Sequence, residues 1–267
     1  MSTPPRPSKA NRREDARAQA LRLKEEQQRA ARRQRTFAVA GLVAGVAILA
    51  VVVALILGQA NSTSLDKTAA PASATASGGI LVGKDGIAGK SDGAKAGAVT
   101  VALYSDFMCP ICKSFEQING ATLDQLRESG DIVMEYHPVS ILDRAAMGTQ
   151  YSTRAANAAA TVADQAPDKF LPFMTSLFAD QPAENTVGLS DDQIAQHAVD
   201  AGVPQAVADT FTKGTFTSWV GAATEQASKD LGQLGTPTIL LNGTKLDAKV
   251  DWRVAGALEA AIKAAQG

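Results

Sequence analysis

The chain has 267 residues, of which 45% are hydrophobic, with two cysteines and a formal net charge of -1. This composition excludes wholesale disorder and collagen-like repeats, and two cysteines exclude a disulfide-rich scaffold, a four-cysteine zinc site and a four-cysteine iron–sulfur cluster. The near-neutral net charge is the sum of a basic region and an acidic region. Residues 1–35 hold 11 Lys and Arg against 4 Asp and Glu, whereas the remaining residues hold 15 against 23.

A run of 21 apolar or Gly residues, Phe37–Leu57, separates these two regions. A bilayer core about 30 Å thick needs roughly 20 such residues in a helix. A buried core helix would rarely stay apolar on every face, and the apolar part of a cleaved signal peptide is typically about 7–15 residues long. We therefore predict a transmembrane helix over residues 36–58 in preference to either alternative.

The charges that flank this run predict its orientation. Basic residues crowd its N-terminal side, whereas the first twenty residues on the other side carry only Asp66 and Lys67. The positive-inside rule then places residues 1–35 in the cytoplasm as a basic tail and the larger part of the chain outside. Residues 59–79 are rich in Ala, Ser and Thr, so we expect a flexible linker there and a folded domain over residues 80–267.

The folded domain is expected to begin with strands around one helix. Gly79–Gly89 has short apolar pieces around a Lys-Asp-Gly turn, which suggests a hairpin. Strands are predicted at Ala98–Tyr104 and Ile132–Tyr136, with a helix at Lys113–Glu128 between them. This strand–helix–strand order indicates an α/β domain.

A helical block is predicted over about residues 142–232, where no convincing strand pattern occurs. The final part of the chain again predicts strands and a helix. The expected elements are a helix at Ala145–Ala163, a helical face of Phe170, Phe173, Met174, Leu177 and Phe178, a helix at Asp191–Ala201 opened by a Ser190 and Gln193 capping box, a helix at Phe211–Leu231, a strand at Thr238–Leu241, a turn at Asn242-Gly243, a pairing strand within Thr244–Val250, and a closing helix at Trp252–Ala265.

Both cysteines lie in one Cys-x-x-Cys, Cys109-Pro110-Ile111-Cys112, directly after a predicted strand and at the start of a predicted helix. The thiolate is the nucleophile in disulfide exchange, and the unpaired N–H groups and positive potential of a helix N-terminus favour its formation. Cys109 is expected there, partly exposed, as the nucleophile. Cys112, one turn further in, is expected to be shielded and to resolve the mixed disulfide. Pro110 suits the first helical turn.

Three other interpretations of the cysteines are weaker. A structural disulfide across so short a loop contributes only about 2 kcal/mol in the loop-entropy model. A zinc site needs further ligands, and neither histidine, His137 or His197, has a partner at finger-like spacing. Two unpaired core cysteines would rarely fall at this spacing by chance. We therefore predict a redox-active pair with no metal and no other cofactor, in a compartment that permits disulfides.

The segment Tyr104–Cys112 resembles the active-site segment of DsbA-like thiol–disulfide oxidoreductases of the membrane-anchored or secreted actinobacterial type. Gly235-Thr236-Pro237-Thr238, just before a predicted strand, resembles the cis-proline loop of that family. The resemblance implies a thioredoxin fold with an inserted helical domain, preceded here by a single N-terminal transmembrane helix. It also implies a cis Thr236-Pro237 bond that faces the cysteines and presents backbone groups to an extended peptide.

Two positions depart from the family pattern. Ile111 stands where strong oxidases often have His. A helix terminus alone contributes at most about 2 kcal/mol, which would bring the pKa of a thiol from about 8.5 to about 7, so we predict a milder oxidant. Leu103 stands where thioredoxin relatives commonly carry a buried acid. Asp106 or Glu135 could substitute as a proton relay; otherwise Asp106 caps the active-site helix and Glu135 lies on a solvated strand face.

The expected function is that of a membrane-tethered extracytoplasmic oxidoreductase that donates its Cys109–Cys112 disulfide to exported proteins. Pro237 is expected to shape the peptide groove, with Thr236, Pro110 and an apolar rim of Phe107, Met108 and Ile111 at the substrate. The resemblance implies a quinone-linked membrane partner that reoxidises the pair, and nucleic acid is not an expected partner. The alternatives are an extracytoplasmic disulfide reductase, an isomerase, and a non-catalytic chaperone or binding module with this fold.

Overall fold

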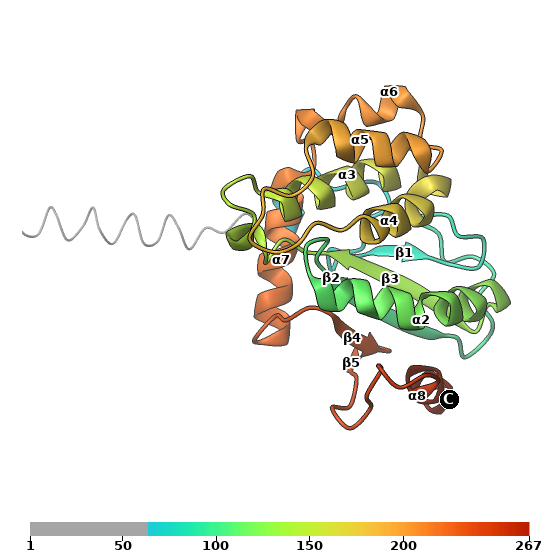
Figure 1. Cartoon of the computed structure of the whole chain (residues 1–267). Coiled ribbons are helices and arrows are strands. Elements are labelled where there is room, and N and C mark those ends of the chain that lie inside the picture. Colours follow the sequence, from blue (N-terminus) through green and yellow to red (C-terminus); the bar gives the residue numbers. More distant parts are fainter. Residues whose placement is uncertain (1–63, 267) are drawn as a thin grey trace, which may run out of the picture. The chain divides into compact units, whose positions relative to one another are not determined.

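The computed structural model describes residues 64–266 (Figure 1). The predicted basic tail (1–35), the predicted transmembrane helix (36–58) and the first residues of the predicted linker lie outside this range and stay predictions. Within residues 64–266, no helix combines the length and the apolar character that a membrane crossing requires.

A five-stranded mixed sheet of order β1-β3-β2-β4-β5 organises the described residues (Figure 1). The neighbours β2 and β3 run parallel, with Leu103 opposite Tyr136, and every other pair is antiparallel. Helix α2 (Pro110–Ser129) connects β2 to β3, as the strand–helix–strand pattern predicted. The strand bounds are Ile80–Val82 for β1, Val99–Ser105 for β2, Ile132–Pro138 for β3, Thr238–Leu241 for β4 and Thr244–Lys245 for β5.

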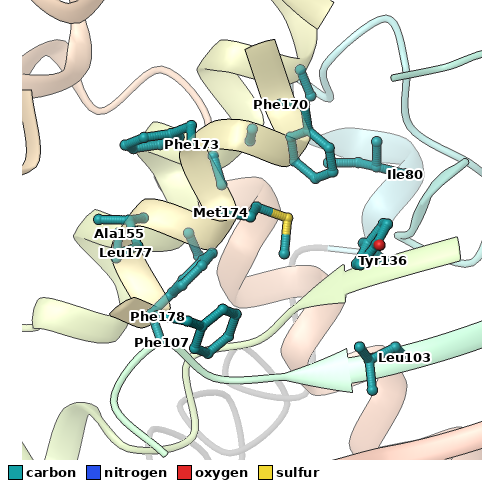
Figure 2. Close-up of a cluster of buried hydrophobic side chains, with 14 of the residues drawn as sticks. Ile80, Leu103, Phe107, Tyr136, Ala155, Phe170, Phe173, Met174, Leu177 and Phe178 are labelled. Atoms are coloured by element: carbon teal, nitrogen blue, oxygen red, sulfur yellow. The ribbon is translucent and has the colours of Figure 1, made fainter. Parts of the chain in front are cut away.

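Successive side chains of each strand point to opposite faces of the sheet, and other elements cover the apolar side chains on both faces. On one face, the buried ring of Tyr136 meets that of Phe170 in α4 (Phe170–Ala179) edge-on, with centroids 5.8 Å apart (Figure 2). On the other face, Ala102 and Tyr104 pack in a smaller buried cluster with Ala227 of α7 (Thr217–Leu231). The strand end at Ser105, where the cysteine segment begins, therefore emerges between two packed layers.

The predicted helical block is present between β3 and β4. Its elements are η2 (Asp143–Ala145), α3 (Tyr151–Gln165), η3 (Pro167–Lys169), α4, α5 (Asp191–Asp200), α6 (Gln205–Ala208), η4 (Phe211–Lys213) and α7. The capping box of Ser190 and Gln193 is confirmed at the start of α5. The single helix predicted at Phe211–Leu231 is wrong in one respect, because Gly214 takes a left-handed conformation (φ 62°) that ends η4 before α7 begins.

The C-terminal elements are shorter than predicted. The last helix, α8 (Ala257–Ala264), begins after Gly256 in a left-handed conformation (φ 77°) rather than at Trp252. Trp252 is instead buried in the preceding turn, where its ring meets the ring of Phe115 edge-on at 5.3 Å. The turn at Asn242-Gly243 is confirmed, but the strand that follows it, β5, is only two residues long.

The hairpin predicted at Gly79–Gly89 forms only as a short return. Val82 bridges Ala88 in the antiparallel sense, and backbone N–H groups donate from Gly89 to Leu81 (2.7 Å) and from Gly83 to Lys90 (2.6 Å). The longer pairing of Ile80–Val82 is with β3, which places Ile80 opposite Tyr136.

The flexible linker expected over residues 59–79 differs from the structure from residue 64 onward. This lead-in segment (residues 64–79) lies against the domain: the backbone N–H of Ala72 donates to the Asp164 carboxylate at 2.8 Å, and the hydroxyls of Thr75 and Ser77 both donate to Glu135 at 2.7 Å. Leu65 and Ala74 pack against the hydrophobic core, and hydrogen bonds to distant carboxylates add to these contacts.

Candidate active site

The two cysteines lie at the junction of β2 and α2. Cys109 is the N-cap residue of α2, and Pro110 follows at the first helical position, as predicted. Both cysteines are free thiols in this structure. The thiol of Cys109 donates to the carbonyl oxygen of Thr236 at 3.4 Å, and the Thr236-Pro237 bond is cis, as the resemblance implied. The structure thus brings together residues that are 127 positions apart in the chain.

Fewer side chains are exposed around the cysteines than the sequence predicted. Cys109 is only 5% exposed rather than partly open, and Cys112 is 1% exposed. Ile111 is 44% exposed, so it remains a candidate substrate contact. Phe107 and Met108 are buried beneath the loop, and the ring of Phe107 lies 5.1 Å from that of Phe178 in α4. The expectation that Phe107 and Met108 line the substrate surface is therefore not met, because both fill the core.

The thiols of the two cysteines differ sharply in acidity. Hydrogen bonds from the side chains of Cys112 and Thr236 and from the backbone N–H groups of Cys112 and Ile111 outweigh burial and lower the pKa of Cys109 to about 6. Burial, together with the neighbouring Cys109, raises the pKa of Cys112 far above its ordinary value. At neutral pH, Cys109 is therefore a thiolate and Cys112 a thiol, which is the division of roles that the sequence predicted.

Asp106 is buried behind the active-site loop and does not cap α2. Its carboxylate accepts hydrogen bonds from the backbone N–H of Met108 (2.9 Å) and of Leu142 (2.9 Å) and from the hydroxyl of Ser152 (2.6 Å). Burial raises the pKa of Asp106 to about 6 against these hydrogen bonds. The expected cap is thus wrong: the carboxylate instead joins the loop to the start of the helical block.

Glu135 is not on a solvated strand face. It is largely covered and accepts hydrogen bonds from Thr75 and Ser77, with Nε2 of His137 at 3.5 Å from its carboxylate. Burial opposes ionisation, but His137 and the hydroxyls of Ser77 and Thr75 outweigh it and lower the pKa of Glu135 to about 2. No hydrogen bond of Glu135 involves Cys112, so nothing in this geometry supports the proton-relay hypothesis for it.

The two histidines and the tryptophans have structural positions. His137 is buried, and its ring stacks on that of Tyr104 with centroids 4.0 Å apart. His197 contacts Ser176 at 2.8 Å and Asp180 at 3.1 Å. Trp219 and Trp252 are both buried. Among residues 64–266, no group of three or more His, Cys, Asp or Glu side chains is arranged to hold a metal ion.

A groove of about 380 Å³ begins at the cis-proline. Pro237 was expected at such a groove, but the other walls, from β4, β5 and the turn before α8, were not predicted. Its lining includes Pro237, Thr238, Ile239, Leu246, Trp252 and Arg253. The groove places an open, mixed apolar and charged surface beside Pro237, where an extended peptide could lie.

Comparison with known proteins shows the family of this chain. The family model described as "Thioredoxin" matches residues 88–264. The chain belongs to the thioredoxin family. DsbA from Mycobacterium tuberculosis, in its reduced form, is 30% identical, with a TM-score of 0.58 over 71% of this chain and 92% of that one. Together with the cysteine and cis-proline geometry, this likeness makes the chain a DsbA-like thiol–disulfide oxidoreductase of the thioredoxin family, and its fold is the thioredoxin fold with a helical insertion.

Two further matches have lower sequence identity. MdbA, a thiol-disulfide oxidoreductase from Actinomyces oris, is 21% identical over 74% of this chain and 90% of that one, with a TM-score of 0.58, which shows the fold alone. The serine/threonine-protein kinase PknE of Mycobacterium tuberculosis is 26% identical over 154 residues, or 55% of this chain. The chain spans only about a quarter (27%) of the length of these curated relatives.

Three residues of this thioredoxin-family site were not predicted. Ser152 holds Asp106, as described above. Gln181, in the loop after α4, donates from Nε2 to the carbonyl oxygen of Cys109 at 2.9 Å. Glu116, one turn after Cys112, lines a cavity of about 360 Å³ between α2 and α4, where burial and then Asp124 raise its pKa to about 7. Each depends on long-range packing, so spacing along the chain could not reveal it.

Proposed function

We propose that the protein is a membrane-tethered extracytoplasmic oxidase that passes its Cys109–Cys112 disulfide to exported proteins. The observation that carries the direction of electron flow is the lowered pKa of Cys109. Stabilising the thiolate stabilises the reduced pair, and a pair whose reduced form is stabilised is a stronger oxidant. The value of about 6 lies between the roughly 7 of thioredoxin and the roughly 3.5 of the strongest oxidants, so we expect an oxidant of intermediate strength.

The proposed reaction has two exchange steps. A substrate thiolate attacks Sγ of Cys109 in the disulfide, the bond between Cys109 and Cys112 breaks, and Cys112 leaves with the electron pair and takes up a proton. A second substrate thiolate then attacks the substrate sulfur of the mixed disulfide and displaces Cys109 as a thiolate. The substrate loses two electrons and the enzyme pair gains them, so another oxidant must regenerate the pair. A quinone-linked membrane reoxidase is the partner that we propose for this step.

The proposed location rests on the sequence. The 21-residue apolar run Phe37–Leu57 and the excess of basic residues before it support a single transmembrane helix with the N-terminus in the cytoplasm. The catalytic domain would then face the compartment through which exported proteins fold. The exposed side chain of Ile111 and the groove beside Pro237 support an extended polypeptide as substrate.

The direction of electron flow is tested by equilibrating the full-length protein with glutathione. We expect a reduction potential between the roughly -120 mV of a strong oxidase and the roughly -270 mV of thioredoxin, nearer to the latter because the pKa of about 6 is nearer to that of thioredoxin. A potential at or below the thioredoxin value would replace the oxidase by a reductase. Oxidation of a reduced, unfolded secretory protein should disappear in Cys109→Ser, whereas a chaperone would keep its effect on aggregation in that variant.

The acidity of Cys109 is tested by alkylation. The rate of reaction of the reduced protein with iodoacetamide should rise about tenfold per pH unit below pH 6 and level off above it, since only the thiolate reacts. Cys112 should stay unmodified over the same range because it is buried and protonated. A midpoint near pH 4 would indicate a much stronger oxidant, and one near pH 8.5 would remove the argument for an oxidase.

A further inference from the structure

The loop that follows α4 is joined to the start of α2 by two hydrogen bonds. Gln181 donates from Nε2 to the carbonyl oxygen of Cys109 at 2.9 Å, and Lys113 donates from Nζ to the carbonyl oxygen of Ala179, also at 2.9 Å. Gln181 is half-buried and is 72 residues from Cys109 in the chain. The helical insertion therefore contacts the backbone of the nucleophilic residue directly.

The carbonyl oxygen that Gln181 binds belongs to Cys109, the residue at which α2 begins. As the N-cap residue of α2, Cys109 has a non-helical backbone (φ -80°, ψ 114°), and its side chain makes no capping hydrogen bond. Its carbonyl oxygen already accepts the N–H groups of Cys112 (3.0 Å) and Lys113 (3.2 Å) from within the helix. Gln181 adds a third donor from outside the helix, and this donor opposes rotation of the peptide unit that carries the carbonyl.

Rotation of that peptide unit would move the sulfur of Cys109. The sulfur now lies 3.4 Å from the carbonyl oxygen of Thr236 and close to the N–H groups of the first helical turn. Donors that point toward a thiolate favour its charged form, and the amide of Gln181 also presents the positive end of its dipole to this region. Both effects would weaken if the amide were removed.

We propose that Gln181 is a positioning residue for disulfide exchange, whose amide holds the backbone of Cys109 so that its sulfur stays at the N-terminus of α2. Through it the helical insertion acts on the nucleophile and not only on the substrate surface. This inference rests on Cys109 being the nucleophile of the proposed reaction. It does not depend on the direction of electron flow or on the membrane.

The test measures the thiolate of Cys109 in the reduced full-length protein by its absorbance near 240 nm. Only Cys109 contributes below about pH 9, because burial raises the pKa of the other cysteine. Gln181→Met keeps the length of the side chain and removes the donor, and Gln181→Glu also adds a negative charge. We expect the thiolate midpoint to rise by about half a unit in Gln181→Met and by about one unit in Gln181→Glu.

A matched control distinguishes this role from general loosening of the insertion. Gln196 makes a similar side-chain hydrogen bond, to Asp200 at 2.8 Å, but on the exposed face of α5. Gln196→Met should leave the thiolate midpoint unchanged. The proposal is overturned if Gln181→Met and Gln181→Glu titrate like the wild type, or if the control shifts as much as they do. Because the readout is the thiolate itself, it stays informative even if the wild-type protein oxidises no substrate.

Discussion

Asp106 holds the active-site loop and Glu135 holds the end of the lead-in segment next to the sheet, and these two carboxylates behave in opposite ways. Asp106 is fully buried and binds three uncharged donors, two of them backbone N–H groups, and its pKa is raised to about 6. Glu135 binds the two hydroxyls of the lead-in segment beside His137, and its pKa is lowered to about 2. The hydrogen bonds to Asp106 do not fully offset its burial, whereas the neighbouring His137 and the hydroxyls of Ser77 and Thr75 do so for Glu135.

This difference implies different roles in the structure. The donors of Asp106 come from the active-site loop and from the helical insertion, 36 and 46 residues further on, so its carboxylate fixes where the cysteine segment leaves the sheet. The donors of Glu135 come from a segment that precedes the sheet. Gly79 makes that approach possible, because a Cβ there would lie 2.6 Å from Cγ of Glu135. Loss of Asp106 should therefore disturb the active site, and loss of Glu135 should free the lead-in segment.

The largest expected effect is that of Asp106→Ala. It leaves the N–H groups of Met108 and Leu142 buried without an acceptor, so the free energy of unfolding should fall by about 2–4 kcal/mol. Glu135→Ala should cost less, about 1–2 kcal/mol, because the hydroxyls that it releases lie near the surface and can turn to water. Urea unfolding followed by tryptophan fluorescence measures both. A larger loss of stability in Glu135→Ala than in Asp106→Ala would contradict the different roles assigned to the two carboxylates.

The contributions of the two carboxylates to stability should depend on pH in opposite directions. The pKa of Asp106 rises on folding from an ordinary 3.8 to about 6, so its contribution is fully present below about pH 4 and is lost as the pH rises through 6. The pKa of Glu135 falls from an ordinary 4.5 to about 2, so its contribution is present above pH 4.5 and is lost as the pH falls toward 2. The change should be on the order of 3 kcal/mol for Asp106 and about 1–2 kcal/mol for Glu135, because solvent partly screens the charge of Glu135.

Two isosteric variants test these slopes. In Asp106→Asn, the loss of stability between pH 4 and pH 6 should disappear, and in Glu135→Gln the loss between pH 4.5 and pH 2 should disappear. The measurement is the free energy of unfolding at half-unit pH steps for the wild type and both variants. Parallel profiles in all three proteins would show that other groups set the pH dependence.

The parts of this fold that the sequence predicted are those encoded by neighbouring residues. The β-rich apolar run Ala98–Tyr104, the Cys-x-x-Cys after it and the capping box of Ser190 are local patterns, and each formed within a residue of where it was expected. The cis Thr236-Pro237 bond is not local in this sense. It was predicted through the family resemblance, which carries the spatial pairing of that loop with the cysteines.

The errors came from residues whose partners are distant in the chain. Asp106 looks like a cap because it precedes a helix, but two of its three donors belong to the helical insertion. Phe107 looks like a surface aromatic residue beside the cysteines until α4 supplies Phe178 to cover it. The lead-in segment looks flexible because its own side chains are small and polar, and its stabilising acceptors, Asp164 and Glu135, appear far along the chain. Composition measures apolar burial and does not detect such pairings.

The smallest expected effect belongs to the hydroxyls that bind Glu135. Thr75→Val keeps the shape of the side chain and removes a hydroxyl that donates to Glu135 and accepts the backbone N–H of Gly79, and the free energy of unfolding should fall by only about 0.5–1.5 kcal/mol. The local result should be clearer than the global one, because segments held by few contacts open without unfolding the domain. Limited proteolysis should therefore cleave the lead-in segment faster in Thr75→Val, while the thiolate midpoint of Cys109 stays at the wild-type value.

Thr68→Val is the matched control, since that hydroxyl donates to the backbone carbonyl of Leu65 rather than to a carboxylate, and its cleavage should stay close to that of the wild type. If Thr75→Val shifted the Cys109 titration, the two carboxylate-held regions would be coupled, and the separation drawn between them would be wrong.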